Sequence, residues 1–213
     1  MLMLGFDIGG TFTDLALYDS TSETFRITKV PSNAADPADA LSRGLAELGV
    51  SPDQIATVMH GTTVTTNALI ERRGARVCLV TTEGFRDLIE IGRTMRMVPG
   101  LFNTKFVRAE PLVPRERRIE VKERTLSSGE ILISLTSEEI ERVIAAIQQM
   151  SAQSVAICLL NSYRSQEHEQ RLCDELTSSL PGLYVVASSQ VISEFREYER
   201  FNTTAVMRFS VRC

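Results

Sequence analysis

The segment GFDIGGTFTD, residues 5–14, places two adjacent glycines and two threonines between apolar stretches. A turn that exposes successive backbone N–H groups can bind an anion, and glycine lets that backbone approach a phosphate without an intervening side chain. Gly9 and Gly10 suit this task, and the hydroxyls of Thr11 and Thr13 can donate further hydrogen bonds to phosphate oxygens. We therefore expect a phosphate-binding turn.

Two aspartates flank the turn, Asp7 before it and Asp14 after it. Carboxylate oxygens are hard ligands of the kind that Mg²⁺ prefers, so we expect Asp7 to hold Mg²⁺ directly or through its waters, and Asp14 to do likewise. A simpler interpretation also exists, in which the glycines make a tight turn that Asp7 and Thr11 cap through local hydrogen bonds. The two interpretations differ in whether the turn binds a ligand.

A second polar stretch, HGTTVTTNAL, spans residues 60–69 between a predicted strand and a predicted helix. The N-terminus of a helix presents free N–H groups and a partial positive charge, so Thr62 and Thr63 can meet a phosphate or a developing oxyanion. Alternatively, one of these threonines is only the N-cap of the helix. His60 could act as a general base near neutral pH if it lines the cleft, although a lone histidine at a strand end often makes only structural hydrogen bonds.

Residues 93–118 are rich in proline and arginine, and we interpret them as a long functional loop. An arginine fork suits a carboxylate or imide oxygens, which makes Arg93 a candidate substrate-binding residue, although most arginines in basic loops face solvent. We expect His168 and its glutamate neighbours on the surface. The segment FREYER, residues 195–200, is interpreted as a charged helix with structural ion pairs.

The composition excludes several classes of partner. With 213 residues, 43% of them hydrophobic, a net charge of −4 and a pI near 5.4, the chain has no general attraction for nucleic acid or anionic lipid. Cys78 and Cys158 lie inside apolar runs and are expected to be buried and reduced, which fits the cytoplasm. No secretory signal or membrane-length apolar run is present, so we expect no membrane partner.

The hydrophobic periodicity predicts an α/β protein with a mixed sheet, led by an antiparallel meander of three strands. Expected helices include one with Asp36 as N-cap and Gly49 at its end, and one that begins with a capping box from Thr136 to Glu139. The alternation around SSG predicts a hairpin over residues 117–135. The expected strands are 2–8, 13–18, 23–30, a buried 55–60, a buried 75–82, 154–160 and 183–188, and the expected helices are 36–49, 63–74, 84–92, 136–150 and 165–180.

The segment DIGGTFTD after an N-terminal strand resembles the first phosphate-binding loop of the actin, sugar-kinase and heat-shock-chaperone ATPase superfamily, and the element order resembles its ribonuclease-H-like core. More narrowly, the chain resembles the N-terminal region of the hydantoinase/5-oxoprolinase family. These are ATP-using enzymes that open five-membered cyclic amides, with acetone carboxylase subunits as relatives. The resemblance covers residues 4–204 and is carried, in order, by GFDIGGTFTD, HGTTVTTNALIERRG, TTEGFRDLIEIGR, PLVPRERRIEVKER and FREYERFNTT.

The resemblance implies that ATP, with Mg²⁺, phosphorylates an amide oxygen of hydantoin or 5-oxoproline, so that water can open the ring. It also implies that Gly9, Gly10, Thr11 and Thr13 cradle phosphate while Asp7 serves Mg²⁺. Two alternatives stay open: a subunit of an ATP-dependent ketone carboxylase of the acetone type, and a non-catalytic truncated remnant or interaction module.

The expected organisation is a family region over residues 1–204, divided into a phosphate-loop core (1–92), a proline-rich loop with a hairpin (93–135) and a second small α/β unit (136–190). Residues 205–213 are an atypical tail. ATPases of this superfamily close two lobes around the nucleotide, and from the resemblance we expect the second lobe to lie outside these 213 residues. The resemblance therefore implies a complementary lobe or hydantoinase B-type subunit as partner, and little activity from the isolated chain.

Overall fold

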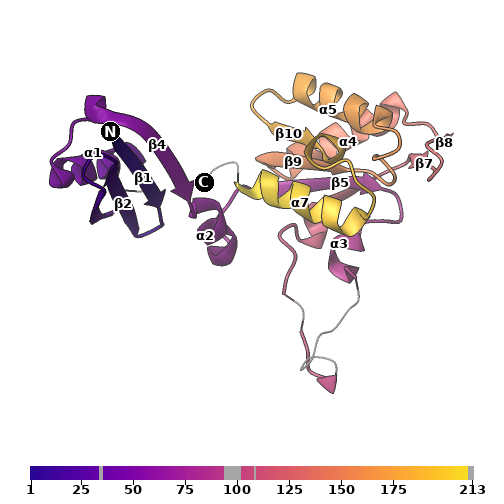
Figure 1. The fold of residues 1–213 in the computed structure, drawn as a ribbon. Coiled ribbons are helices and arrows are strands. Elements are labelled where there is room, and N and C mark those ends of the chain that lie inside the picture. Colours follow the sequence, from indigo (N-terminus) through magenta and orange to yellow (C-terminus); the bar gives the residue numbers. More distant parts are fainter. Residues whose placement is uncertain (34–35, 94–101, 108, 211–213) are drawn as a thin grey trace. The chain divides into compact units, whose positions relative to one another are not determined.

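The computed structural model describes residues 1–33, 36–93, 102–107 and 109–210 (Figure 1). The described residues form two compact units, Met1–Arg73 and a second unit that begins at Gly74. The predicted core over residues 1–92 crosses this boundary. The strand at 77–82 does not pair with the strand at 55–62. It pairs with strands that come later in the sequence, in the sheet of the second unit.

The first unit is built on one four-stranded sheet, ordered β3-β2-β1-β4. Its strands are β1 (Leu2–Ile8), β2 (Phe12–Asp19), β3 (Thr24–Pro31) and β4 (Ile55–Thr62). The first three form the antiparallel meander that the sequence predicts, and β4 runs parallel to β1. The fold class, a mixed α/β arrangement with antiparallel strands, is confirmed.

Helix α1 (Pro37–Leu48) covers one face of this sheet. The Asp36 side chain caps it by accepting a hydrogen bond from the Ala38 N–H, and Gly49 ends it with φ of 65° in the left-handed region. Its apolar side meets Leu15 and Leu17 in the core of the unit. A 3-10 turn (Pro52–Gln54) leads into β4, and α2 (Val64–Glu71) follows β4.

The second unit has a parallel sheet ordered β10-β9-β5-β6. Helices α4 and α5 cover one face and α7 covers the other (Figure 1). The strands are β5 (Val77–Thr82), β6 (Arg118–Val121), β9 (Ser154–Cys158) and β10 (Tyr184–Ala187), and the helices are α3 (Leu88–Ile91), a 3-10 turn (Arg115–Arg117), α4 (Ser137–Gln149), α5 (Glu167–Ser179), α6 (Ser188–Val191) and α7 (Glu197–Phe209).

Several local predictions need correction. Only β7 (Arg124–Thr125) and β8 (Ile131–Ile133) form the expected hairpin, because β6 buries Ile119 and Val121 beside β5 in the parallel sheet. The predicted helix over residues 84–92 is reduced to the four residues of α3. The family region was expected to end at residue 204, a position that lies inside α7. Part of the proline-rich loop, residues 94–101 and 108, lies outside the described residues.

Burial confirms the expectation for two cysteines. Cys78 and Cys158 are fully buried, and burial raises the pKa of the Cys78 thiol to about 12. Burial also raises the pKa of Cys158 well above its ordinary value. Within the part of the chain that the structure describes, no helix is both long and apolar enough to cross a membrane.

Candidate functional site

The glycine turn joins β1 to β2 and is held by hydrogen bonds of its own and from β3. The Gly9 N–H donates to the Phe12 carbonyl at 3.0 Å, and the N–H of Ser32 donates to the Thr11 carbonyl at 2.9 Å. The Ser32 hydroxyl donates to the Gly9 carbonyl at 2.8 Å. These bonds use carbonyls of the turn as acceptors. The N–H groups of Gly10 and Thr11 donate none of them.

Both glycines lie in close contacts, but only the contact at Gly9 is with the backbone. A Cβ on Gly9 would lie 2.9 Å from the Phe12 carbonyl oxygen, closer than real Cβ atoms come to a backbone atom. A Cβ on Gly10 would lie 3.2 Å from the amide nitrogen of Asn67. A side chain at Gly9 would therefore force the backbone to shift, whereas a Cβ at Gly10 would only require the end of the Asn67 side chain to give way. A backbone without side chains can approach a phosphate closely.

The two threonines of the turn have different surroundings. Thr11 is exposed, so its hydroxyl can reach a ligand over the turn. Thr13 is fully buried, and its hydroxyl shares a hydrogen bond of 2.9 Å with Ser32. A direct contact of Thr13 with phosphate stays a prediction, while its observed role is to support the serine that holds the turn.

The end of β4 and the start of α2 converge on the same turn. Because β1 and β4 are parallel, their carboxyl ends lie side by side (Figure 1). The N–H of Thr63 and the hydroxyl of Thr62 both donate to the Ile8 carbonyl at 3.3 Å. Thr63 is the N-cap of α2 by backbone conformation, but its side chain makes no capping bond. Both threonines thus stand beside the turn, at a helix N-terminus that favours anions.

Asn67 is a site residue that sequence reasoning missed. Its side chain lies against Gly10 and donates to the Thr63 hydroxyl at 3.5 Å. The signal was available in its spacing, four residues after Thr63 in a predicted helix, which puts both side chains on one helix face. An amide at this place can donate to a phosphate oxygen.

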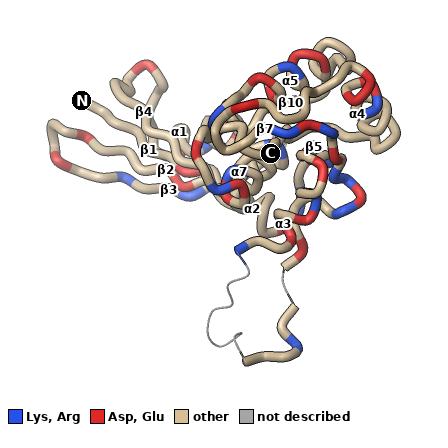
Figure 2. The backbone as a smooth tube through the Cα atoms, turned by 90° about the vertical axis from the view of Figure 1, so that its right-hand side faces the viewer, with Lys and Arg blue, Asp and Glu red and all other residues tan. Residues whose placement is uncertain are grey.

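The two aspartates lie together in the structure. Asp7 and Asp14 are direct partners in the β1–β2 register, so their side chains share one face of the sheet. Lys29 pairs with Asp14 at 3.0 Å. On the other side of Asp7, Gly61 leaves room, since a Cβ there would approach the Asp7 carboxylate oxygen to 3.4 Å. Figure 2 shows where such charges fall along the backbone.

The donor set suits Mg²⁺ only together with a phosphate ligand. Among the described residues, no group of three or more His, Cys, Asp or Glu side chains is arranged to hold a metal ion. Mg²⁺ in nucleotide sites usually takes one or two carboxylates and completes its octahedron with phosphate oxygens and water. Asp7 and Asp14, beside a turn with open N–H groups, fit that pattern.

His60 lies on the other face of the sheet. It is the register partner of Phe6, and the two rings stack with centroids 4.5 Å apart. Asp7 is the partner of Gly61, the next residue along β4, and side chains alternate between faces along a strand. The structure therefore does not bring His60 and Asp7 together, and a catalytic role for His60 stays a prediction.

Arg93 belongs to the second unit, where it bonds to Glu199 of α7. Neighbouring arginines are also paired. Arg115 donates two hydrogen bonds to Asp87, at 2.9 and 3.1 Å, and this guanidinium holds the pKa of Asp87 below its ordinary value. The buried Arg118 donates to the Val113 carbonyl and to Glu90. Substrate binding by Arg93 stays a prediction.

The helix that contains FREYER is architectural, as its sequence suggests. Arg200 is buried and donates to Ser162, Ser188 and the Leu159 carbonyl, while Glu169 faces it at 3.7 Å. The buried position of Glu169 corrects the expectation of a solvated charge.

His168 is likewise buried, against the expected surface position. It accepts the Leu135 N–H at Nε2, so Nδ1 carries the proton and donates to Glu123 at 2.8 Å. His168 and Glu169 are both buried residues of α5, a helix whose sequence is largely polar.

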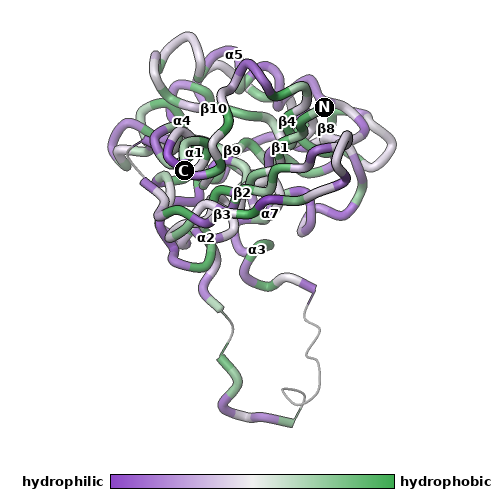
Figure 3. The backbone as a smooth tube through the Cα atoms, turned by 60° about the vertical axis from the view of Figure 1, so that its left-hand side comes forward, coloured by the Kyte–Doolittle hydropathy of each residue, from purple (hydrophilic) through white to green (hydrophobic). Residues whose placement is uncertain are grey.

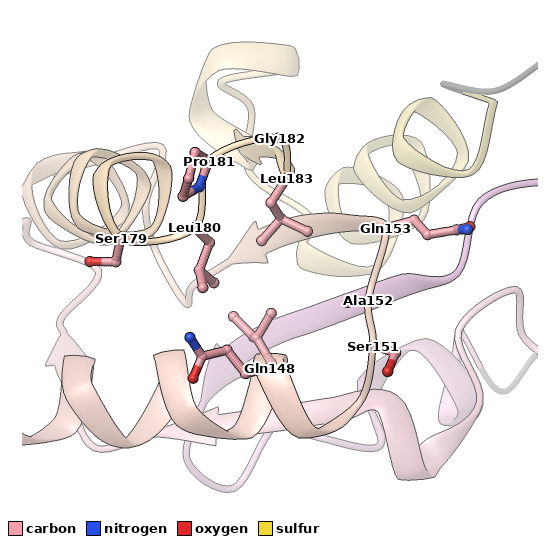
Figure 4. Close-up of a pocket in the computed structure, with 10 residues that line it drawn as sticks. Gln148, Ser151, Ala152, Gln153, Ser179, Leu180, Pro181, Gly182 and Leu183 are labelled. Carbon is pink, nitrogen blue, oxygen red and sulfur yellow. The ribbon is translucent and has the colours of Figure 1, made fainter.

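One cavity of about 430 Å³ lies in the second unit, where α4 leads to β9 and α5 leads to β10 (Figure 4). Figure 4 shows Gln148 of α4 and the turn from Ser179 to Leu183 around it. Its lining carries no charged side chain and none of the predicted site residues. This cavity therefore has no link to the phosphate turn.

The chain is similar in sequence to known proteins of one family. Residues 3–179 match the family described as hydantoinase/oxoprolinase N-terminal region. The chain is 35% identical to the caprolactamase subunit alpha of Pseudomonas jessenii, over 95% of this chain and 30% of that protein. It is 30% identical to 5-oxoprolinase 1 of Arabidopsis thaliana, over 94% of this chain and 18% of that protein.

Two solved structures are similar over the whole chain. The nucleotide-free structure of an ATP-dependent acetone carboxylase has a TM-score of 0.87 at 26% identity, over 98% of this chain and 32% of that one. The ATP-dependent caprolactamase of Pseudomonas jessenii has a TM-score of 0.84 at 34% identity, over 97% of this chain and 31% of that one. This chain thus spans about a third or less of each of these relatives.

Proposed function

Because the chain belongs to the hydantoinase/oxoprolinase family, we propose that its first unit binds the phosphates of ATP in an enzyme that opens cyclic amides by phosphorylating the amide oxygen. The observation that supports this proposal is the meeting of three features at one edge of the sheet. These are a turn with no room for a Cβ at Gly9, the N-terminus of α2, and the carboxylate pair of Asp7 and Asp14.

Each residue of this edge has a distinct task in the proposal. The N–H groups of Gly10 and Thr11 and the Thr11 hydroxyl donate to phosphate oxygens, and Thr62, Thr63 and the first turn of α2 stabilise the negative charge. Bound Mg²⁺ would neutralise charge on the transferring phosphoryl group. Asp7 and Asp14 would hold that ion, directly or through water.

The structure gives less support to the two remaining predicted site residues, His60 and Arg93. His60 would need to act from the opposite face of the sheet, where it stacks on Phe6. Arg93 would need to exchange Glu199 for a substrate carboxylate. We retain Arg93 as a proposed substrate ligand, and general base catalysis by His60 as the alternative to its structural stacking on Phe6.

Ring opening also needs parts that this chain does not supply. Since the relatives are about three times as long or longer, we propose that the adenosine pocket and most substrate contacts belong to the remainder of the whole protein or to a partner subunit. A relative described as a subunit, the caprolactamase subunit alpha, supports a multi-subunit enzyme. The isolated chain should therefore bind phosphate but turn over poorly.

A second candidate function is ATP-dependent carboxylation of a ketone, which the likeness to acetone carboxylase supports. The same phosphate chemistry would then activate bicarbonate or a ketone enol. ATP turnover by the whole protein with 5-oxoproline, hydantoin, caprolactam, or acetone plus bicarbonate separates the two functions.

The decisive experiment is a titration of the ¹⁵N-labelled chain with Mg²⁺ and a non-hydrolysable ATP analogue. We expect saturable NMR shifts at the Gly10 and Thr11 amides, with little change at Gly5 in the middle of β1. Shifts confined to other residues, or none up to millimolar analogue, would contradict the phosphate site. If no shifts appear even when the complementing subunit is present, the result would favour a non-catalytic interaction module.

A further inference from the structure

One row of charged side chains crosses the first sheet close to the glycine turn. The β2–β3 register pairs Asp14 with Lys29, and the β1–β2 register pairs Asp14 with Asp7. Gly61 of β4 continues the row beside Asp7. Hydrophobic residues otherwise concentrate in the strands (Figure 3). Three charges at one level of the sheet are therefore a local feature that formation of the apolar core does not explain.

Lys29 lies on the same face of the sheet as the two aspartates. Its neighbours Thr28 and Val30 face the other way, since the Thr28 hydroxyl bonds to α1 and Val30 is buried in the core under that helix. Side chains alternate along a strand, so Lys29 points away from α1. Its ammonium lies 3.0 Å from an Asp14 carboxylate oxygen and 5.8 Å from the centroid of the Phe12 ring. Because Phe12 directly follows the turn, this positive charge lies beside the proposed phosphate site.

Other basic side chains of the first unit make contacts elsewhere. Arg26 shares β3 with Lys29, where Figure 2 shows blue segments, but it donates to the Leu48 carbonyl at the end of α1. Arg43 forms an ion pair within α1. Arg73 pairs with Glu71 at the C-terminal end of α2, whereas the turn lies at the N-terminal end of that helix. Lys29 is thus the cation that the fold places at the carboxylate pair.

We propose that Lys29 is a further phosphate-binding residue, a role that rests on the phosphate site proposed above. In the free chain its ammonium neutralises Asp14. When nucleotide binds with Mg²⁺, the ammonium moves from the Asp14 carboxylate to a phosphate oxygen over the turn, and Asp14 becomes available to the ion. A lysine binds phosphate as a compact charge with three N–H donors on a flexible stem, which suits such a move.

The charges favour this exchange of partners. Lys29 is 58% exposed and Asp14 is 49% exposed, and an ion pair so exposed contributes little to stability, so breaking it costs little. A divalent cation at Asp14 would repel the ammonium, while the phosphates attract it. The competing explanation is that Lys29 only guards β3, an outer strand of the sheet, because lysine on an edge strand deters pairing with other chains. That explanation predicts no response of Lys29 to nucleotide.

The movement of Lys29 can be observed directly, because the 213-residue chain holds three lysines, Lys29, Lys105 and Lys122. In the chain labelled with ¹⁵N and with ¹³C at lysine Cε, Mg²⁺ and a non-hydrolysable ATP analogue should shift the Lys29 Cε signal together with the Gly10 and Thr11 amides. Lys105 and Lys122, both in the second unit, are internal controls. Amide shifts without a Lys29 shift would overturn this proposal alone, whereas the absence of both would overturn the phosphate site with it.

Substitution separates phosphate binding from guarding of the edge. Lys29→Met should weaken Mg²⁺-dependent binding of the analogue by about ten-fold, since it removes a hydrogen bond from a charged group. The same variant should bind Mg²⁺ alone more tightly, because no ammonium competes for Asp14. Lys29→Arg keeps the charge and should retain most of the affinity, and Lys122→Met, at an exposed lysine of the second unit, is the matched control. Unchanged affinity of Lys29→Met for the analogue in calorimetric titration would overturn the proposal.

Discussion

Asp7 and Asp14 stand directly opposite each other on β1 and β2, and the only cation paired with either among the described residues is Lys29, which pairs with Asp14. Two like charges in direct cross-strand contact destabilise a sheet. In the proposed phosphate site, a bound divalent cation would relieve this repulsion. We therefore expect the proposed site to depend on its ligands.

Asp7→Asn should weaken Mg²⁺-dependent binding of an ATP analogue by about ten-fold or more, since contacts to charged groups contribute about 1.5–3 kcal/mol. Binding measured without Mg²⁺ should change little or improve, because one negative charge is gone. Calorimetric titration with and without Mg²⁺ checks this. Asp53→Asn, at the exposed 3-10 turn before β4, is the control. Equal losses in both conditions would argue against an ion at Asp7.

Gly9→Ala should destabilise the turn by about 1–3 kcal/mol, because its Cβ would lie 2.9 Å from the Phe12 carbonyl and the backbone would have to shift. Gly5→Ala in β1, the strand that leads into the turn, is a matched control, since its Cβ would meet only an ordinary contact at 3.8 Å. Denaturant unfolding gives the free energies. Equal stability of the two variants would show that the turn does not need its glycine.

The burial of Cys78 makes the stability of the folded chain depend on pH. Its pKa rises from 9.0 to about 12, so the folded state holds the thiol proton more tightly than the unfolded state. The resulting stability is fully present below pH 9 and is lost as the pH rises toward 12. At pH 8, alkylation with mass spectrometry should find Cys78 and Cys158 unmodified in the native chain and modified in denaturant. Rapid native labelling of Cys78 would contradict its burial.

Arg200→Met should cost about 3–5 kcal/mol of unfolding free energy, because it leaves the buried Glu169 without its cation. The double variant with Glu169→Gln should recover part of this loss, since the neutral amide no longer needs a counter-charge. Thermal and denaturant unfolding measure both. Arg142→Met, at a half-exposed arginine of α4, should lose far less. A double variant no more stable than Arg200→Met alone would argue that the ion pair is not the main contribution.

Local sequence signals account for what could be predicted. The meander follows from alternation around short turns, and α1 follows from Asp36 and Gly49, since each of these signals acts within a few residues. Pairing of β6 with β5 brings together strands more than thirty residues apart, which alternation alone cannot specify. Glu169 was expected in solvent because charged residues of a helix usually are exposed. Its burial depends on hydrogen bonds from Leu159, Ser188 and Ser189 and on the buried Arg200, all of which come from other segments of the chain.

The candidate site, like the fold, could be predicted only where the signals are local in the sequence. Gly9, Gly10 and Asp7 could be proposed from the sequence because turn chemistry is local. Ser32 could not, because its contact with the turn depends on the register of β3 against β2. The separation of His60 from Asp7 depends on which residue of β4 faces which residue of β1, and a shift of one position would reverse it.

His60 offers the last test, because its structural and catalytic roles respond differently to substitution. His60→Phe keeps an aromatic ring on Phe6 and should retain stability, whereas His60→Ala loses a stack of about 0.5–1.5 kcal/mol. If the ring is only structural, the phenylalanine variant of the whole enzyme keeps its ring-opening rate and its pH profile. A large fall in kcat with unchanged stability, together with loss of the acidic limb of the profile, would instead establish general base catalysis. The face that His60 occupies leads us to expect the first result.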